Sequence, residues 1–234
     1  NHALLWKKLA KAQNLSQHPI EQVIQTYQRA LALDSNNLKL RIRIAKLQYQ
    51  HLDFNGSIKT LRGDYSNIKT SYEGQYLLAW NYLEVRKFNN AKKHIKIARR
   101  LDNAKVDILT VMKFYADKQY NSGINFIKGL KKKTISYQYL LALNYSGKKW
   151  VKSASKYYLK LDLSTSHQFL AKFHSIQLLA PNSIGSDVSH YLKALQQLSQ
   201  LRVLTPYIAY RGAYAAFNNN LKDEAKIWLE DLAL

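Results

Sequence analysis

The sequence predicts an all-α protein in which helical hairpins repeat along the chain. Of the 234 residues, 47% are hydrophobic, which is enough to build a core. The eight glycines and three prolines leave little material for tight turns, which argues against an all-β sandwich or barrel. Apolar residues recur at helical spacing, and a small residue returns about every 34 positions.

One repeat is clearest in the segment 75–103. Apolar residues at Leu78 and Tyr82, then at Phe88, Ala91, Ile95 and Ala98, mark two helices, and we expect residues 87–90 to form the joining turn. The small residue at the start of the second helix is Ala91. Its counterparts are Val23, Ser57, Gly123, Ser153, a position near His190, and Ala225. The spacings are 34, 34, 32, 30 and 72 residues, and the last equals two steps of about 36.

This pattern resembles the tetratricopeptide repeat (TPR) family, whose unit is about 34 residues with small residues where two helices cross. The best matches are Leu78-Ala79…Tyr82…Phe88…Ala91…Ala98, the run Tyr27–Asp34 and the run Asn220–Ala225. The resemblance implies a right-handed α-solenoid of about six to seven TPR-like repeats, forming one superhelical domain over 1–234. The stretch 165–200 fits the repeat least. First helices would line a concave face, and second helices would cover the convex side.

The chain is strongly basic, with 36 lysines and arginines against 15 acids and a formal net charge of +21. Between Lys118 and Ser186 there are eleven lysines and one acid, Asp162. The absence of cysteine excludes disulfide scaffolds, thiol nucleophiles and cysteine-ligated zinc. A surface with so few acids favours an acidic partner.

Basic residues also follow the helical period on the expected convex side. Lys148, Lys152, Lys156 and Lys160 recur every four residues and would form a stripe. The residues five positions after the crossing residue in consecutive repeats, Arg62, Lys96 and Lys128, would stack into a ladder. Two interpretations stay open: a solvated outer face that keeps the solenoid monomeric, or an anion-binding surface.

The expected concave side carries cations and aromatic rings. Lys39, Arg43 and Lys46 lie on one side of a first helix, with Lys7 and Lys11 beside them in the preceding repeat. Lys39 and Arg43 resemble the basic pair with which some TPR modules hold a peptide carboxylate. Further residues expected to point into the groove are Tyr76, Trp80, Tyr139, Tyr210, Arg211 and Tyr214. Such a row suits extended peptides, sugar rings or unpaired bases.

The sequence lacks the usual catalytic motifs. It contains no phosphate-binding glycine loop, no G-x-S-x-G elbow and no H-E-x-x-H. Its only helical histidine pair, His167 and His174, is two turns apart, too far for both rings to bind one ion. We therefore predict a protein that is not an enzyme and has no catalytic residues, metal site or cofactor.

The favoured function is a protein-interaction scaffold that binds an acidic protein or peptide in the concave groove. By analogy with the family, it would serve as an assembly factor of a bacterial pilus, secretion or polysaccharide-export machine. The alternative is direct binding of a polyanion: RNA, single-stranded DNA, an acidic polysaccharide or an anionic membrane surface. A third interpretation is a regulatory module of a longer protein. The chain begins at Asn1, so we expect an upstream segment to be missing; no apolar run is long enough to span a membrane, which predicts a soluble chain. Bacterial cytoplasm and periplasm both fit, and the oligomeric state is open.

Overall fold

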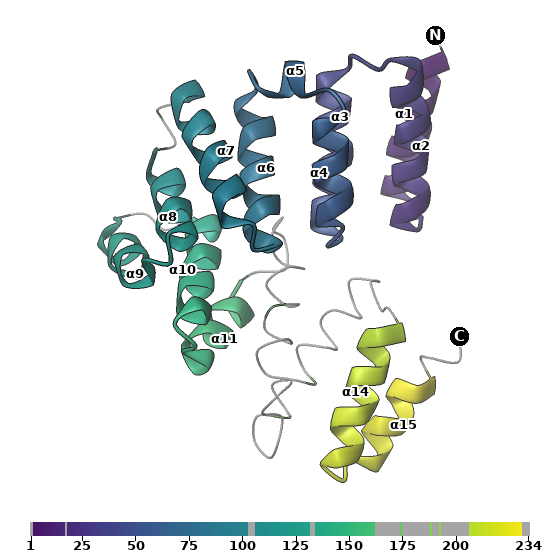
Figure 1. Cartoon of the computed structure of the whole chain (residues 1–234). Coiled ribbons are helices and arrows are strands. Elements are labelled where there is room, and N and C mark those ends of the chain that lie inside the picture. Colours follow the sequence, from purple (N-terminus) through teal and green to yellow (C-terminus); the bar gives the residue numbers. More distant parts are fainter. Residues whose placement is uncertain are drawn as a thin grey trace. The chain divides into compact units, whose positions relative to one another are not determined.

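The computed structural model describes residues 2–16, 18–102, 106–131, 134–161 and 206–230, together with the single residues 174, 188 and 192. Throughout these described ranges the regular structure is helical, which confirms the all-α prediction (Figure 1). The chain divides into two compact units, Asn1–Asp117 and Lys118–Leu234, in the following called unit 1 and unit 2. One continuous superhelix over the whole chain, with six to seven repeats, stays a prediction, and 165–200 lies almost entirely outside the described residues.

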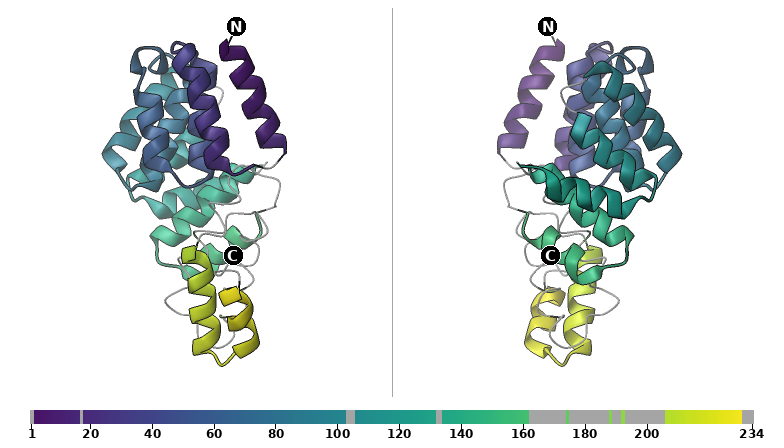
Figure 2. Two further views of the ribbon diagram at one scale, coloured as in Figure 1. Left: turned by 90° about the vertical axis from the view of Figure 1, so that its right-hand side faces the viewer. Right: turned by 90° about the vertical axis from the view of Figure 1, so that its left-hand side faces the viewer.

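Unit 1 contains eight of the helices in the described ranges. They are α1 His2–Leu15, α2 Ile20–Leu33, α3 Leu38–Gln50, α4 Phe54–Arg62, the short α5 Tyr65–Ile68, α6 Tyr72–Glu84, α7 Phe88–Leu101 and α8 Val106–Ala116. Figure 2 shows unit 1 from two sides, with α1 at one edge. In unit 2 the helices are α9 Tyr120–Gly129, α10 Ile135–Gly147, α11 Val151–Leu159, α14 Pro206–Asn218 and α15 Lys222–Glu230.

Consecutive helices pack as hairpins. The pairs in extensive contact are α1 with α2, α3 with α4, α6 with α7, α10 with α11, and α14 with α15. Neighbouring hairpins meet where α2 contacts α3, α4 contacts α6, α7 contacts α8, and α9 contacts α10. Such contacts between successive helices of neighbouring hairpins are compatible with a helical repeat array.

The repeat register predicted from the small residues is confirmed, with one correction. Second helices begin at Ile20, Phe54, Phe88, Tyr120 and Val151, which lie 34, 34, 32 and 31 residues apart. The fourth residue of each second helix is buried. These residues are Val23, Ser57, Ala91, Gly123, Ala154 and Ala225.

In the fifth hairpin the crossing residue is therefore Ala154, which is fully buried, and not the partly exposed Ser153 that we predicted. Two adjacent small residues cannot be ranked from spacing alone, because either keeps the period within its scatter. The position near His190 lies outside the described residues.

In three of the hairpins a second contact joins the two helices, between residues twelve positions apart. In α3–α4, Thr60 Oγ1 donates to Gln48 Oε1 over 2.7 Å. In α6–α7, the His94 ring stacks on Tyr82 with centroids 5.2 Å apart. In unit 2, Tyr157 stacks on Tyr145 at 5.5 Å. Different side chains thus serve the same structural position.

The hairpin turns use the left-handed backbone conformation without glycine. Residues with positive φ lie two positions before the second helix, at Leu52, Arg86, Lys118, Lys149 and Asn220, with φ between 55° and 67°. In α6–α7, the Arg86 N–H donates to Leu83 O and the Lys87 N–H to Tyr82 O, so the helix ends in a Schellman motif. The turn spans 85–87 and not the predicted 87–90, because α7 already begins at Phe88.

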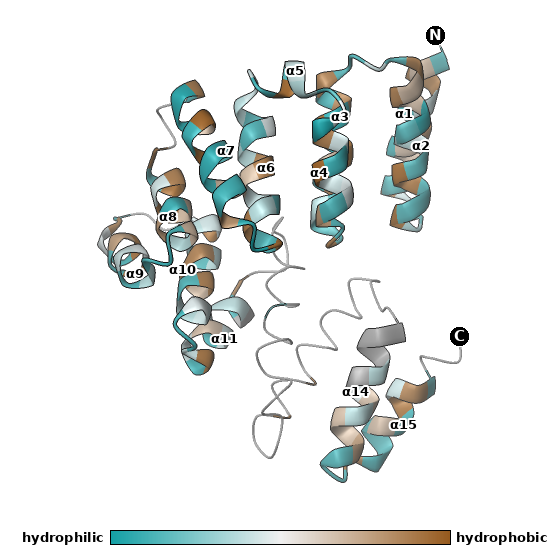
Figure 3. Ribbon diagram, viewed as in Figure 1, coloured by the Kyte–Doolittle hydropathy of each residue, from teal (hydrophilic) through white to brown (hydrophobic). Residues whose placement is uncertain are grey.

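Polar residues start several helices. Asn37, Asp53 and Ser71 each accept a hydrogen bond from the backbone N–H three residues later, at 2.9, 2.8 and 3.1 Å. Pro19 precedes α2 and Pro206 opens α14, as their fixed φ favours. Helix α7 is buried along Ala91, Ile95 and Ala98, while the side seen in Figure 3 is largely hydrophilic.

Candidate functional site

The first helices α3 and α6 share an exposed face in unit 1. Lys46 of α3 and Glu73 of α6 form an ion pair, and both side chains are about half exposed. An exposed pair of this kind adds little stability, but it shows which sides of the two helices lie next to each other. Lys39 and Arg43 are exposed on the same helix as Lys46. Lys46 therefore lies beside α6, whereas Arg43 contacts Tyr27 of α2.

Arg43 is held in place by a buried tyrosine. Its Nε donates to the Tyr27 hydroxyl over 2.9 Å, and its guanidinium lies 5.2 Å from the Tyr27 ring centroid. Tyr27 itself is only 3% exposed in α2. Within the described chain, the structure gives no partner for the terminal nitrogens of Arg43. The guanidinium is thus oriented on one side, while its other donors face solvent.

Lys7 is engaged within the protein. Its Nζ lies 3.1 Å from Asp34 Oδ2, which also accepts a 2.7 Å hydrogen bond from Asn37 Nδ2. The hydrogen bonds from Asn37 and Lys7 hold the pKa of Asp34 below its ordinary value. Lys7 thereby joins α1 to the end of α2. Of the five cations predicted on the concave sides of α1 and α3, Lys11 and Lys39 are exposed without an ion pair in the described residues.

Trp80 does not line a groove, contrary to the prediction. It is 1% exposed, and most of α6 is buried because α3, α4 and α7 contact it. Trp80 packs edge-on against Tyr76 at 6.1 Å, and Tyr76 stacks on Tyr72 at 5.6 Å. The half-buried rings of Tyr72 and Tyr76 therefore form the accessible end of this column. Tyr72 was not predicted, although its spacing of four residues from Tyr76 was a usable signal.

Tyr139 is also a core residue and not a groove residue. It is fully buried in α10 and packs against Tyr158 of α11, with ring centroids 5.8 Å apart. The prediction failed because α10, like α6, is covered on more than one side, by α9 and α11.

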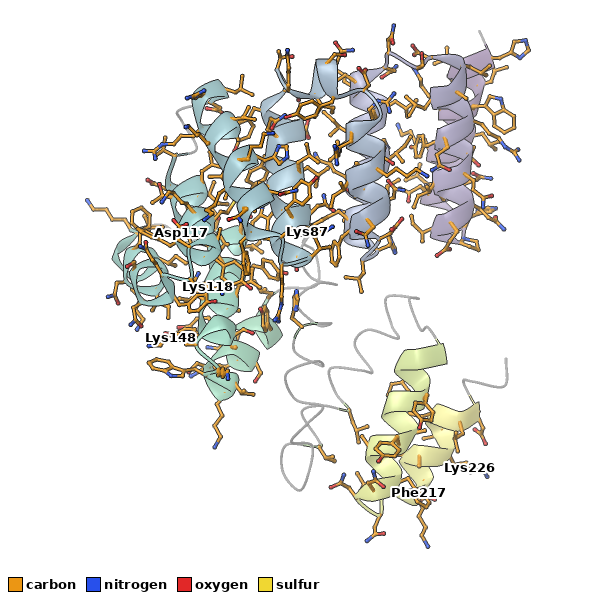
Figure 4. The ribbon with its side chains drawn as sticks, viewed as in Figure 1. Lys87, Asp117, Lys118, Lys148, Phe217 and Lys226 are labelled. Carbon is orange, nitrogen blue, oxygen red and sulfur yellow. The ribbon has the colours of Figure 1, made fainter. Side chains whose placement is uncertain are left out.

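An exposed aromatic row does exist on α14. Tyr210 and Tyr214 are 56% and 59% exposed, and their rings stack at 6.1 Å. Phe217, labelled in Figure 4, extends the row and is 68% exposed. Phe217 was not predicted, although the spacing 210, 214, 217 follows one face of a helix. The side chain of Arg211 lies outside the described residues.

The predicted convex cations are on the surface. Arg62, Lys96, Lys128, Lys152, Lys156 and Lys160 are all exposed. Arg62 and Lys96 belong to unit 1 and Lys128 to unit 2, so a ladder through all three stays a prediction. Two further lysines of unit 1, Lys92 and Lys113, both pair with Asp117, at 3.3 and 2.6 Å.

Lys148 departs from the predicted stripe because it belongs to the turn before α11. Its Nζ donates to Asn121 Oδ1 over 2.5 Å and lies 3.7 Å from the centroid of the Trp150 ring. Trp150 is 50% exposed. It is the most exposed of the four tryptophans, since Trp80 and Trp228 are buried and Trp6 lies partly covered beneath Arg29.

The buried histidine of unit 1, His94, serves packing. Its Nδ1 lies 2.7 Å from Gln75 Oε1, and its ring stacks on Tyr82. Burial, helped by the charges of Lys93 and Arg62, lowers the pKa of His94 to about 4. His94 is therefore neutral at physiological pH.

Two features are absent from the described part of the chain. It holds no group of three or more His, Cys, Asp or Glu side chains placed to bind a metal ion. None of its helices is both long enough and apolar enough to cross a membrane.

No protein-family model matches this chain, and no curated protein sequence matches it. The resemblance to the TPR family therefore stays a prediction from the repeat pattern.

Proposed function

We propose that this chain is a non-catalytic scaffold that binds an acidic protein segment along the exposed face of α1, α3 and α6. The observation that carries the proposal is Arg43. Tyr27 orients its guanidinium through a hydrogen bond and ring contact, and its remaining donors face solvent. A planar, oriented guanidinium suits two-point binding of a carboxylate.

The surroundings of Arg43 support the same partner. Lys39 lies one turn earlier on α3, and Lys11 is exposed on α1, without a carboxylate partner among the described residues. Lys46 of α3 already forms an ion pair with Glu73 of α6, so this acid does not neutralise Arg43. Tyr72 and Tyr76 offer ring surface on α6, the helix that Lys46 of α3 contacts through Glu73, which suits a peptide with both acidic and apolar side chains. Attraction over longer range by the +21 chain would raise the association rate.

The test is binding of a fluorescein-labelled peptide with alternating Glu and Leu residues, measured by anisotropy at physiological salt. The double variant Lys39→Ala with Arg43→Gln removes the oriented guanidinium of Arg43 and the charge of Lys39. We expect its affinity to fall at least about tenfold, because hydrogen bonds between charged groups contribute roughly 1.5–3 kcal/mol each. The matched control is Lys96→Ala with Arg100→Gln, which removes the same charges at the same spacing from α7.

The control variant should lose less than about threefold, since exposed charges act mainly on the on-rate. Equal losses in both variants would show that only net charge matters, and the proposed face would then be wrong. Full binding by the Lys39/Arg43 variant would also contradict the proposal. The role in a bacterial envelope machine, implied by the family resemblance, stays a prediction until a natural partner is identified.

A further inference from the structure

Three rings form a continuous stack at the α10–α11 turn of unit 2. Trp150 stacks on Tyr145 with centroids 5.8 Å apart and planes 22° apart, and Tyr145 stacks on Tyr157 at 5.5 Å and 14°. Nearly parallel rings at 5.8 Å are strongly offset, so Tyr145 covers only part of the indole. Tyr145 is 6% exposed, whereas Trp150 is 50% exposed. The indole is therefore the accessible end of a column that is anchored in the hairpin.

The contact of Trp150 with Tyr145 has a structural role that does not account for its size. The Trp150 N–H donates to Tyr145 O over 3.0 Å, which places the two residues at the positions that touch in a Schellman motif. The corresponding position is Lys87 in α6–α7 and Leu221 in α14–α15. A lysine or leucine thus suffices for the turn, and the exposed half of the indole is available for another purpose.

The cation beside this ring has a neutral partner. Lys148 Nζ, at the turn labelled in Figure 4, lies over the indole and donates to the amide oxygen of Asn121. By contrast, Lys7, Lys46, Lys92 and Lys113 of unit 1 all contact carboxylates. A phosphate oxygen would be a stronger acceptor for Lys148 than the amide it now contacts. Moving the ammonium onto a phosphate would also uncover the face of the indole.

The charge around Trp150 has one sign. Residues 118–161 include ten lysines and no acid. Lys149, Lys152, Lys156 and Lys160 are exposed, and the structure gives them no ion pair with described residues. The last three follow one another along α11, roughly 6 Å apart along the helix axis.

We propose that Trp150 and Lys148 bind one nucleotide of a single-stranded nucleic acid. The base stacks on the indole, its phosphate accepts from Lys148, and Lys152 and Lys156 contact the adjoining backbone. A flat ring combined with a row of cations is how proteins bind single strands without base-specific contacts. The site lies in unit 2 and does not depend on the proposed peptide-binding face of unit 1.

Other polyanions fit the site less well. The sugar rings of an acidic polysaccharide can lie on an indole, but they carry no π face of their own and so match the stack of rings less well than a base. An anionic membrane surface would need more exposed apolar area than one indole between Lys149 and Lys152 supplies. Both are outcomes of the test.

The experiment uses the complete chain and fluorescein-labelled oligouridine and oligothymidine of twelve nucleotides, with anisotropy measured from 50 to 300 mM salt. Trp150→Leu keeps an apolar residue on the turn but removes the ring. We expect its affinity to fall about five- to a hundredfold at 150 mM salt. The slope of log affinity against log salt should stay unchanged, because no phosphate contact is lost.

The double variant Lys152→Gln with Lys156→Gln should instead change the salt dependence, reducing the slope by about 0.7 for each phosphate contact removed. The matched control is Tyr214→Leu, which removes an equally exposed ring from α14 and should leave binding unchanged. Circular dichroism of each variant checks folding, and Lys148→Gln provides a second variant whose affinity should also fall.

Three results would overturn the proposal. Unchanged affinity of Trp150→Leu would show that no base stacks on the indole. A loss of affinity in Tyr214→Leu equal to that in Trp150→Leu would show that the effect is not local. Heparin or phosphatidylserine vesicles that bind more tightly than the oligonucleotides, with the same dependence on Trp150, would identify a different occupant. Because the peptide assay uses variants of unit 1, the failure of either proposal is recognised separately.

Discussion

The hairpins α6–α7 and α10–α11 have the same framework and different surfaces. In both, an asparagine at the tenth position of the first helix donates to the carbonyl four residues earlier over 2.7 Å. Asn81 also donates to Ser57 of the preceding hairpin, whereas Asn144 lies against Gly123, where a Cβ would come within 2.5 Å of its Oδ1. In both, the residue twelve positions after a tyrosine of the first helix stacks on that tyrosine.

The differences lie at the turn and at this stacked position. The turn of α6–α7 ends with Lys87 and that of α10–α11 with Trp150; the stacked residue is the buried His94 in one and Tyr157 in the other. In these two hairpins the repeat therefore determines where a side chain lies, whereas single substitutions decide whether a hairpin contributes packing or a binding surface. The following predictions test this division, from the largest effect to the smallest.

The largest effect should separate the two tryptophans. Trp80→Ala should lower the free energy of unfolding by about 3–5 kcal/mol, because it leaves a cavity where a ring 1% exposed was packed. Trp150→Ala should cost about 1 kcal/mol or less, since half of its ring already faces water. Urea denaturation of both variants checks this. Similar losses would mean that Trp150 is a packing residue after all.

The second effect concerns pH and belongs to α6–α7 alone. The pKa of His94 is lowered from 6.5 to about 4 by burial, so the unfolded chain binds a proton that the folded chain does not take up in this interval. The contribution of neutral His94 to the free energy of unfolding is fully present above pH 6.5. It is lost as the pH falls toward 4, by at most roughly 3 kcal/mol.

His94→Phe should therefore show a weaker fall in stability than the natural chain between pH 7 and pH 4.5, measured by urea denaturation. The matched control is Tyr157→Phe, which alters the corresponding position of α10–α11 and should leave the pH dependence unchanged. Other titrating groups, such as Asp34 and Asp117, cancel in the difference between each variant and the natural chain. Identical profiles for His94→Phe and the natural chain would contradict the prediction.

The smallest effect tests the turn that both hairpins share. Arg86 and Lys149 have φ of 55° and 60°, a conformation that favours glycine. Arg86→Gly and Lys149→Gly should each raise the free energy of unfolding by about 0.5–1 kcal/mol. Lys152→Gly, three residues further along in α11, should instead lower it by about 1 kcal/mol, because it lies inside a helix. The midpoints of urea unfolding measure these changes. A loss of stability in both turn variants would show that the side chains of Arg86 and Lys149 stabilise the turn.

Much of the framework could be read from the sequence because it depends on local period. Helical spacing located the hairpins, and the small residues placed the starts of the second helices to within one residue, as Ala154 in place of Ser153 shows. The exposed cations were predicted as well, since charged side chains remain in water unless they are paired. The sequence alone also determined the net charge and the lack of acids from 118 to 161.

Which aromatic rings are accessible was decided only by the tertiary structure. Trp80, Tyr139 and Trp150 all occupy regular positions of the repeat, yet the first two are buried and the third is half exposed. The period gives the direction of a side chain around its own helix, whereas burial depends on how many neighbouring helices cover that direction. Helices α6 and α10 are covered on several sides, and the turn before α11 is not. The pairing of Arg43 with Tyr27 and of Lys148 with Asn121 and Trp150 likewise arises only when separate helices pack together.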